Sequence, residues 1–455
     1  MVTAGLRRLA LTFREAWNIA MSRQKRRDVL RTPLYANSVY LMANSAATAA
    51  LGFVFWVLVA RFYPAEALGL GSALISAAGL LTFVASLGLG MGLIRFLPGA
   101  GASGSRLINS SFTLTGLAAV AASVIFIAGL SLWSPALAFV RQNAIFIAAF
   151  IGFVVAGTLF TLLTQVLVAL RRAQFVLIQG LLAGLLKIAL VVVIASLFQV
   201  FGIFASWGVS TVVALALGIL LFLPRLQPGY RPFPAMHRQV SNEMLHFSFA
   251  NYTSAGLWSL PTWLLPIIVV NALGSEANAY FYVSWAMASL LFAIPLSTST
   301  SLFAEGSHQE DMLTRDVRRS LKLTVILLLP AIVVMLAAGD KLLLIFGREY
   351  SAEGAKLLWV LAPSAIPVSV NLVYLGIARV KKRLKDVVVV AAAVAAGTLG
   401  LSYALIPHLG ILSPGVGWLA SHTLVALAVL PRLRSSLRTR EPSDSIQATV
   451  RGELR

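Results

Sequence analysis

One lysine inside an otherwise apolar stretch is the residue of this chain best placed to do chemistry within a membrane. Lys187 stands in QGLLAGLLKIALVVV, well inside a stretch that begins near residue 175. At about 1.5 Å per residue it lies roughly 18 Å deep, near the middle of a bilayer. A charge there costs about 2.5–3.5 kcal/mol and usually faces a protein interior or a wet cavity. Lys187 is predicted to attract an anionic headgroup; the alternative is a lysine that snorkels or is paired structurally.

Amide and aromatic side chains gather in several of the other apolar stretches. They suit sugar recognition, because amides hydrogen-bond hydroxyl groups and aromatic rings offer flat apolar faces. The alternative is that they form hydrogen bonds between helices or aromatic belts at the membrane surface. The candidate substrate-binding residues are Lys187, Asn44, Asn251, Tyr252, Trp258, Asn371 and Tyr374.

Two charges close the second and eighth apolar stretches at equivalent positions. Arg95 and Glu305 are predicted to form a cytoplasmic gate pair; the alternative is two independent interfacial charges. Glycines precede Arg95, and a proline with a Ser/Thr run (297–301) precedes Glu305. Such residues favour bending, or alternatively simple close packing. The candidate gate residues are Arg95, Glu305, Gly88, Gly90, Gly92 and Pro295.

The elements that would position these residues are membrane-spanning helices. The chain is 59% hydrophobic and 11% charged, with a mean hydropathy of +0.87, whereas a soluble domain carries about 25% charged residues. Backbone amides in lipid must be satisfied within their own segment, so spans of about 20 residues are helices. An all-α polytopic membrane protein with twelve transmembrane helices is predicted, with spans at 34–60, 68–97, 108–132, 144–170, 175–197, 202–223, 245–273, 277–304, 321–338, 355–378, 387–406 and 412–430.

Positive charges sort to one side of these spans. Of 36 Lys and Arg residues, 30 fall in the two tails and the even-numbered loops, five fall in the odd-numbered loops, and Lys187 remains. The positive-inside rule then places both termini in the cytoplasm, with the protein in the cytoplasmic membrane of a bacterium or archaeon. The net charge of +20 has this explanation, and no basic soluble domain exists to bind nucleic acid. The chain lacks cysteine, which excludes disulfides and thiol chemistry.

Short matches recur between the two halves of the chain at a nearly constant spacing. Glu66 corresponds to Glu276, and the basic pair at Arg171 corresponds to the pair at Lys381. Each half holds an even number of spans, so the repeat is parallel and two six-helix lobes enclose a central cavity, as in alternating-access transporters. The predicted domains are a basic amphipathic segment (1–33), an N-lobe (34–224), a cytoplasmic loop (225–244), a C-lobe (245–431) and a disordered tail (432–455).

The second span carries a family resemblance. Residues 68–98 read LGLGSALISAAGLLTFVASLGLGMGLIRFLP and follow a short loop with an acidic residue. This pattern resembles the polysaccharide-transporter (Wzx-like oligosaccharide flippase) branch of the multidrug/oligosaccharidyl-lipid/polysaccharide exporter superfamily, and residues 278–306 fit it more loosely. The resemblance implies two six-helix bundles that flip undecaprenyl-pyrophosphate-linked oligosaccharides. Peptidoglycan-precursor relatives usually have fourteen spans, against twelve predicted here.

The leading hypothesis is therefore a flippase that moves polyprenyl-pyrophosphate-linked oligosaccharide by alternating access, for cell-surface polysaccharide synthesis. Its expected partners are the lipid-linked oligosaccharide, membrane lipids, and a glycan polymerase or glycosyltransferases. No nucleotide is expected, because the sequence lacks a G-x-x-x-x-G-K-[ST] motif. No cofactor or metal is expected either.

Two other functions compete with this hypothesis. A cation-coupled multidrug exporter would need intramembrane carboxylates, but the sixteen acidic residues fall in loops, tails or span ends. An integral-membrane glycan polymerase or ligase would need catalytic groups in external loops. The longest of these loops, 339–354, is short and lacks histidine, so the chain is not expected to be an enzyme.

Overall fold

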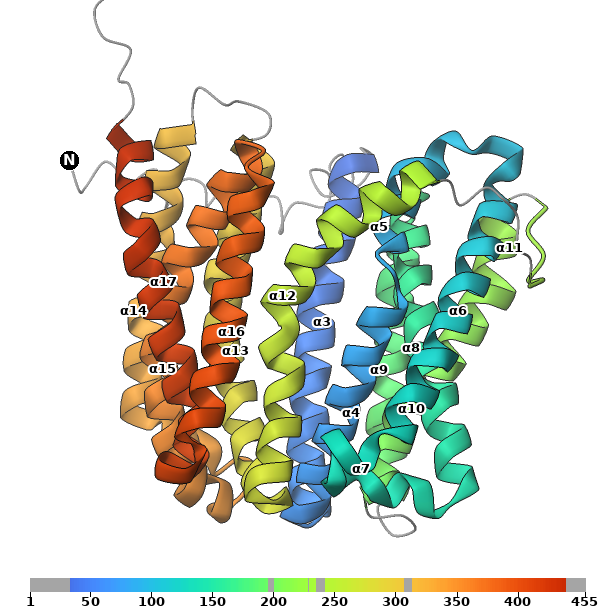
Figure 1. Cartoon of the computed structure of the whole chain (residues 1–455). Coiled ribbons are helices and arrows are strands. Elements are labelled where there is room, and N and C mark those ends of the chain that lie inside the picture. Colours follow the sequence, from blue (N-terminus) through green and yellow to red (C-terminus); the bar gives the residue numbers. More distant parts are fainter. Residues whose placement is uncertain (1–32, 195–199, 228, 235–241, 307–312, 439–455) are drawn as a thin grey trace, which may run out of the picture. The chain divides into compact units, whose positions relative to one another are not determined.

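The predicted spans are helices (Figure 1). The computed structural model describes residues 33–194, 200–227, 229–234, 242–306 and 313–438, and this part contains no β-strand. Eleven of its segments are long and apolar enough to cross a membrane. The longest, Leu384–Arg434, consists of α16 (Leu384–Leu409) and α17 (Ser413–Arg438), which are separated by a left-handed Gly410 with a φ of 52°. Each of the twelve predicted spans therefore coincides with a helix or a broken helix, and the predicted fold class is confirmed.

The helix bounds follow the apolar stretches and often extend past them. For example, α14 (Leu313–Leu343) includes a charged first turn that a hydropathy window leaves out. The other helices are α3 (Pro33–Phe62), α4 (Ala65–Ala85), α5 (Leu89–Phe96), α6 (Gly104–Ala128), α7 (Leu130–Trp133), α8 (Ala144–Ala169), α9 (Ala173–Ile194), α10 (Val200–Leu217), the π-helical turn η4 (Gly218–Phe222), α11 (Leu223–Leu226), α12 (Asn242–Leu273), α13 (Ser275–Gly306) and α15 (Arg348–Val380).

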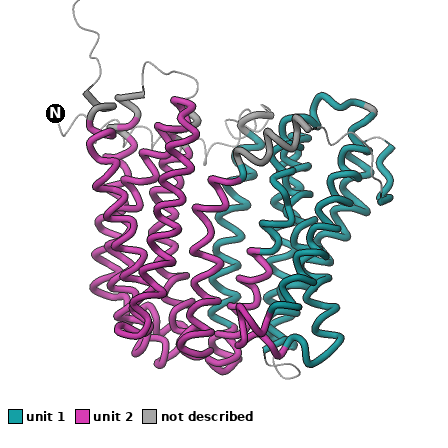
Figure 2. Tube along the Cα trace, in the orientation of Figure 1, with its two compact units in different colours: residues 1–58, 81–129, 140–252 teal, residues 59–80, 130–139, 253–455 magenta. Residues whose placement is uncertain are grey.

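The chain divides into two compact units (Figure 2). Unit 1 comprises Met1–Leu58, Leu81–Gly129 and Val140–Tyr252, and unit 2 comprises Val59–Leu80, Leu130–Phe139 and Thr253–Arg455. This partition does not follow the predicted domain borders, and the division into two six-helix lobes stays a prediction. The predicted amphipathic segment before residue 33 lies outside the described residues. At the other end, α17 continues to Arg438, past the predicted border at residue 431.

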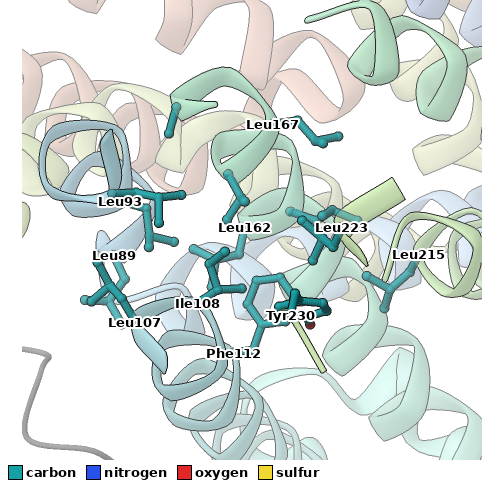
Figure 3. Packing of buried hydrophobic residues seen from close by; sticks show 14 of the residues in the cluster. Leu89, Leu93, Leu107, Ile108, Phe112, Leu162, Leu167, Leu215, Leu223 and Tyr230 are labelled. Carbon is teal, nitrogen blue, oxygen red and sulfur yellow. The ribbon is translucent and has the colours of Figure 1, made fainter. Parts of the chain in front are cut away.

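Unit 1 is built around a leucine-rich cluster (Figure 3). Helices α5, α6 and α8 supply most of it, and α10 and α11 close it on the other side. Tyr230, from the segment after α11, packs into the cluster, and burial raises the pKa of its phenol to about 12. The residues labelled in Figure 3 are Leu89, Leu93, Leu107, Ile108, Phe112, Leu162, Leu167, Leu215, Leu223 and Tyr230.

Unit 2 is organised by α15, which packs against α13, α14 and α17. Side chains of α15 are buried from Tyr350 to Val380 at a spacing that covers more than one face of the helix. Helix α16 packs along α17. Because α15 is surrounded in this way, polar groups on it must be satisfied by its neighbours rather than by solvent.

The same helix-ending turn recurs in both units. Arg171 after α8 and Lys382 after α15 have left-handed φ values of 57° and 55°. The next residue closes each turn, with Arg172 N–H donating to Leu167 O at 2.9 Å and Arg383 N–H donating to Ala378 O at 2.8 Å. This is the Schellman pattern of a helix C-terminus. The sequence match paired Arg171 with Lys381, so the two turns recur within one position of the predicted repeat.

Candidate functional site

Lys187 lies on α9, seven residues before the helix ends at Ile194, and is half-buried. Its Nζ lies 5.0 Å from the centroid of the Phe55 ring in α3, and Phe55 is 1% exposed. An ammonium over an aromatic face gains about 0.5–2 kcal/mol, more as water is excluded. Within the described residues no carboxylate is paired with this ammonium. In this part of the chain its positive charge is therefore stabilised by a ring and not by an opposite charge.

Asn44, a second candidate, lies on the surface of α3 that faces α9. A Cβ added at Gly180 of α9 would collide with Asn44 Oδ1, so this glycine makes room for the amide. Asn44 Oδ1 is buried and has no hydrogen-bond partner in the described part of the chain. A buried carbonyl left without a donor costs about 1–3 kcal/mol. Asn44 is thus placed at a helix interface with unused hydrogen-bonding capacity.

Asn44 and Lys187 belong to one continuous contact between α3 and α9. The contact begins where Asn37 Oδ1 accepts a hydrogen bond from Ala173 N–H at 3.0 Å. From there the paired residues are Asn37 with Ala173, Asn44 with Gly180, Leu51 with Gly184 and Phe55 with Lys187. Residue numbers rise together along both helices, so α3 and α9 run parallel. The structure brings these two candidates to the same interface.

The second span is broken, and the break coincides with the first of the three candidate gate glycines. Helix α4 ends at Ala85 and α5 begins at Leu89. Between them, Leu87 and Gly88 have φ values of 50° and 69°. A left-handed conformation costs a residue with a side chain about 1–2 kcal/mol, whereas glycine adopts it freely. Gly88 is therefore required by the break, and Leu87 is strained.

The other two glycines of this group serve packing. A Cβ at Gly90 would lie 2.8 Å from Cγ of Gln165, so Gly90 allows α5 to approach α8 closely. Gly92 is buried within α5. These two positions fit the close-packing alternative.

Tyr252 of α12 is bound to the broken span. Its hydroxyl accepts a hydrogen bond from Ser86 Oγ at 2.8 Å, and its ring stacks on Phe83 with centroids 4.0 Å apart and planes 7° from parallel. Both partners lie at or just before the break. Tyr252 therefore holds the break in place in this conformation.

The equivalent span of the second half is unbroken. Helix α13 continues through Pro295 to Gly306. The Ser/Thr run joins it to its neighbours: Thr298 Oγ1 and Thr324 Oγ1 lie 2.7 Å apart, and Ser299 Oγ donates to Leu372 O at 2.6 Å. Such hydrogen bonds connect helices, which is the packing alternative for this run.

The Arg95–Glu305 gate stays a prediction. Arg95 is exposed in the last turn of α5, and its guanidinium lies 5.4 Å from the centroid of the Phe96 ring. The side chain of Glu305 lies outside the described residues, as does that of Asn251, another candidate for substrate binding.

Asn371 and Trp258 meet at a histidine that the sequence did not single out. Asn371 Nδ2 lies 3.1 Å from His422 Nδ1 and donates to His422 O at 3.0 Å. The Trp258 and His422 ring centroids lie 5.4 Å apart, and the Trp418 ring, tilted by 53° to the same imidazole, lies 4.1 Å from it. His422 is an ionisable residue within an apolar stretch. The histidine can be recognised in the sequence, but its contact with Asn371 cannot, because Asn371 lies on a different helix.

Tyr374 lies three residues beyond Asn371 on α15, and its hydroxyl has a different partner. It donates to Asp386 Oδ2 at 3.1 Å, in the first turn of α16. This contact ties the end of α15 to the start of the next helix.

Acidic side chains stay near helix ends throughout the described part of the chain. This part contains no group of three or more acidic, histidine or cysteine residues that could hold a metal ion. The described carboxylates lie in the first two turns of a helix or in its last turn: Glu66, Glu276, Asp340, Glu349, Glu353 and Asp386. By contrast, Lys187 lies 14 residues after the start of α9 at Ala173 and seven before its end at Ile194.

Comparison with known proteins agrees with this architecture. The MatE family model matches residues 263–405. No curated protein matches the chain in sequence.

Several solved transporters share the fold. An inward-facing multidrug resistance MATE transporter of the MOP superfamily matches with a TM-score of 0.67 at 14% identity, covering 89% of this chain and 99% of that one. The lipid II flippase MurJ, in an inward closed conformation, matches with a TM-score of 0.71 at 10% identity, covering 87% of each chain. A MOP superfamily transporter from Pyrococcus furiosus, described as having a binding pocket of reverse polarity, matches with a TM-score of 0.61 at 13% identity, covering 90% of this chain and 98% of that one. The chain is thus a multi-pass membrane protein with the fold of the MOP superfamily transporters.

Proposed function

We propose that this protein is a flippase for polyprenyl-pyrophosphate-linked oligosaccharide, working by alternating access in the cytoplasmic membrane. The fold is shared with the lipid II flippase MurJ and with multidrug transporters, so the residues of the site must decide between substrate classes.

One observation supports an anionic substrate above all others. The Lys187 ammonium lies on a membrane-spanning helix, 5.0 Å from the centroid of the Phe55 ring, and no carboxylate of the described residues pairs with it. A lone intramembrane charge costs about 2.5–3.5 kcal/mol and is usually functional. A pyrophosphate group would recover this cost by pairing with the ammonium, whereas a cationic drug would be repelled.

A flippase must supply a polar headgroup with the hydrogen-bonding and charged partners that water supplies outside the membrane. Moving a charged sugar phosphate through hydrocarbon without partners is prohibitive. In the proposed cycle, Lys187 attracts the pyrophosphate and the amide and aromatic candidates contact the sugars, while the polyprenyl tail remains in lipid. Energy comes from ion gradients, the membrane potential or substrate supply.

A second function, cation-coupled multidrug export, is favoured by the MatE model that matches residues 263–405. It requires a carboxylate within the membrane to bind the coupling ion or a cationic drug. The described carboxylates lie near helix ends, which disfavours this function.

Transport by purified protein in liposomes would decide between the two. One set of vesicles carries undecaprenyl-pyrophosphate with a short fluorescent oligosaccharide, and flipping is followed by loss of accessibility to an impermeant quencher. A second set tests uptake of a fluorescent organic cation under an imposed gradient. We expect flipping of the glycolipid well above that of protein-free vesicles, with no cation uptake. Gradient-driven cation uptake without glycolipid flipping would overturn the proposal in favour of the exporter.

A further inference from the structure

The imidazole of His422 is fully buried within unit 2. His422 is in α17, nine residues after the helix begins at Ser413, and it is 0% exposed. Its neighbours come from three helices: Trp258 of α12, Asn371 of α15, and Trp418 one turn earlier in α17. Trp285 and Phe292 of α13 complete the aromatic cluster by packing on Trp418.

The hydrogen bonds of Asn371 determine the protonation state of this imidazole. Asn371 Nδ2 donates to the backbone oxygen of His422 at 3.0 Å. A carbonyl oxygen can only accept, so this bond fixes which end of the amide faces the histidine. The same Nδ2 lies 3.1 Å from His422 Nδ1, so Nδ1 must be an acceptor without a proton. His422 is therefore neutral in this conformation, with its proton on Nε2.

Three polar atoms of the cluster remain unused. His422 Nε2, Asn371 Oδ1 and Trp418 Nε1 are buried without a hydrogen-bond partner in the described part of the chain. Each such group costs about 1–3 kcal/mol. Buried polar groups are normally hydrogen-bonded, so three unsatisfied ones in a single cluster need an explanation.

We propose that His422 is a proton-binding site whose occupancy is coupled to the conformational cycle of the transporter. Binding adds one proton from solvent to the Nδ1 lone pair and gives an imidazolium, with no electron transfer and no other bond broken. A protonated Nδ1 can no longer accept from Asn371 Nδ2, so this one hydrogen bond between α15 and α17 is lost, whereas the bond from Nδ2 to His422 O does not depend on the ring proton. The new cation is stabilised by the faces of Trp258 and Trp418.

The groups that contact this imidazole are uncharged, so none of them offsets the cost of burying an imidazolium in this conformation. Asn371, Trp258 and Trp418 carry no charge at any ordinary pH. On α15, the next titratable group is Tyr374, bonded to Asp386 of α16, and Arg379 lies in the last turn of α15. Neither of these groups is hydrogen-bonded to His422. The balance between neutral and protonated imidazole therefore depends on Asn371 and on access to solvent.

Because it is buried, His422 can couple proton binding to a change of conformation. At 0% exposure a proton cannot reach Nδ1 in this conformation, so binding requires another state in which Nδ1 is open to solvent. A ligand shifts a conformational equilibrium only by its differential affinity for the two states. A proton that binds one state alone meets this condition. The inference rests on the proposed transport function and adds its energy source.

Tryptophan fluorescence gives a readout that does not depend on transport. An imidazolium in contact with an indole quenches its emission, and Trp258 and Trp418 are in contact with His422. In liposomes, we expect the emission of the wild-type protein to fall reversibly as pH is lowered from 8 to 5, and we expect His422→Gln to abolish this fall. The matched control is His408→Gln, which changes an exposed histidine at the end of α16 and should leave the titration unchanged.

Asn371→Asp tests the same site in the opposite direction. A carboxylate at this position accepts a hydrogen bond from a protonated Nδ1, so quenching should begin at a higher pH than in the wild type. An identical titration in wild type, His422→Gln and Asn371→Asp would overturn the proposal, because another group would then be responsible. If His422→Gln does not fold, the Asn371→Asp shift decides alone.

Transport measured alongside separates this proposal from the proposed function. Flipping of the fluorescent undecaprenyl-pyrophosphate oligosaccharide should be accelerated by a pH gradient in the wild type and in His408→Gln, but not in His422→Gln. Acceleration retained in His422→Gln would refute the proton site while leaving the flippase intact. A His422-dependent fluorescence titration without glycolipid flipping would refute the flippase and retain the proton site.

Discussion

Arg61 at the end of α3 donates a hydrogen bond from Nε to the carbonyl oxygen of Ile345, just beyond the C-terminus of α14, at 2.8 Å. Its Nη2 donates to Leu344 O at 2.9 Å. The last carbonyls of a helix lack partners within the helix and carry partial negative charge, so a guanidinium there is doubly favourable. Arg61 and the end of α14 both belong to unit 2, and the contact lies on the side where the charge distribution predicts the cell exterior.

Removing this contact should loosen the external end of unit 2. The chain has no cysteine, so Val59→Cys, at a buried position half a turn before Arg61, provides a single label site. In that background, Arg61→Ala should speed labelling by an impermeant maleimide roughly five-fold, equivalent to about 1 kcal/mol for an exposed charged contact. Arg141→Ala, which removes another exposed arginine, is the control. Equal labelling rates in Arg61→Ala and its parent would show that the contact does not restrain this end.

Alanine substitutions at two glycines, one at the break in the second span and one within the continuous helix α6, should change the stability of the protein in opposite directions. Gly88→Ala forces a Cβ into a left-handed conformation with a φ of 69°, which should destabilise the protein by about 1 kcal/mol. Gly116→Ala, within α6 and with no atom near its new Cβ, should stabilise it by roughly 0.5–1 kcal/mol. Thermal unfolding in detergent measures both. A Gly88→Ala protein as stable as the wild type would mean that the break is not the preferred conformation.

The contact between α3 and α9 predicts that substitutions at Gly180 and Asn44 have coupled effects on stability. Gly180→Ala drives a methyl group into Asn44 Oδ1 and should cost about 1–3 kcal/mol through overpacking. Adding Asn44→Ala removes the collision, so the double variant should recover most of this loss in a double-mutant cycle. Gly152→Ala on α8 has open space around its Cβ and serves as the control. Strictly additive effects of the two substitutions would contradict parallel packing of α3 on α9 at this point.

The positions of the spans could be predicted from the sequence because the bilayer sets one strong rule. Apolar stretches of the right length must be helices, and each of the twelve is present. The glycine-rich end of the second span also indicated bending, and Gly88 lies at a break there. Hydropathy could not predict that the equivalent end of α13 is continuous, because its Ser/Thr run is satisfied by neighbouring helices, as with Thr298 and Thr324.

Partners across helices could not be predicted from one sequence. Lys187 stood out by its charge, but its stacking on Phe55 of α3 depends on tertiary packing. Tyr252 stays a predicted sugar contact, and its hydrogen bond with Ser86 could not be foreseen from the sequence. His422 was not among the predicted site residues, because a single histidine hardly changes the mean hydropathy of an apolar stretch. Its role becomes visible only beside Asn371.

The charge of Lys187 is the centre of this account, and Lys187→Met against Lys187→Arg tests it most directly. Methionine keeps the length and apolar stem of lysine without its charge, and arginine keeps the charge and its contact with Phe55. Phe55→Leu removes the ring alone and controls for packing.

The measurement is the flipping rate of undecaprenyl-pyrophosphate oligosaccharide in liposomes containing equal amounts of folded protein. We expect Lys187→Met to lower the flipping rate at least ten-fold, which corresponds to about 1.4 kcal/mol. Two opposite unit charges about 4 Å apart attract each other by roughly 4 kcal/mol at an effective dielectric of about 20, so loss of the ammonium is sufficient to cause this change. Lys187→Arg and Phe55→Leu should retain most of the wild-type rate. A wild-type flipping rate in Lys187→Met would contradict the account.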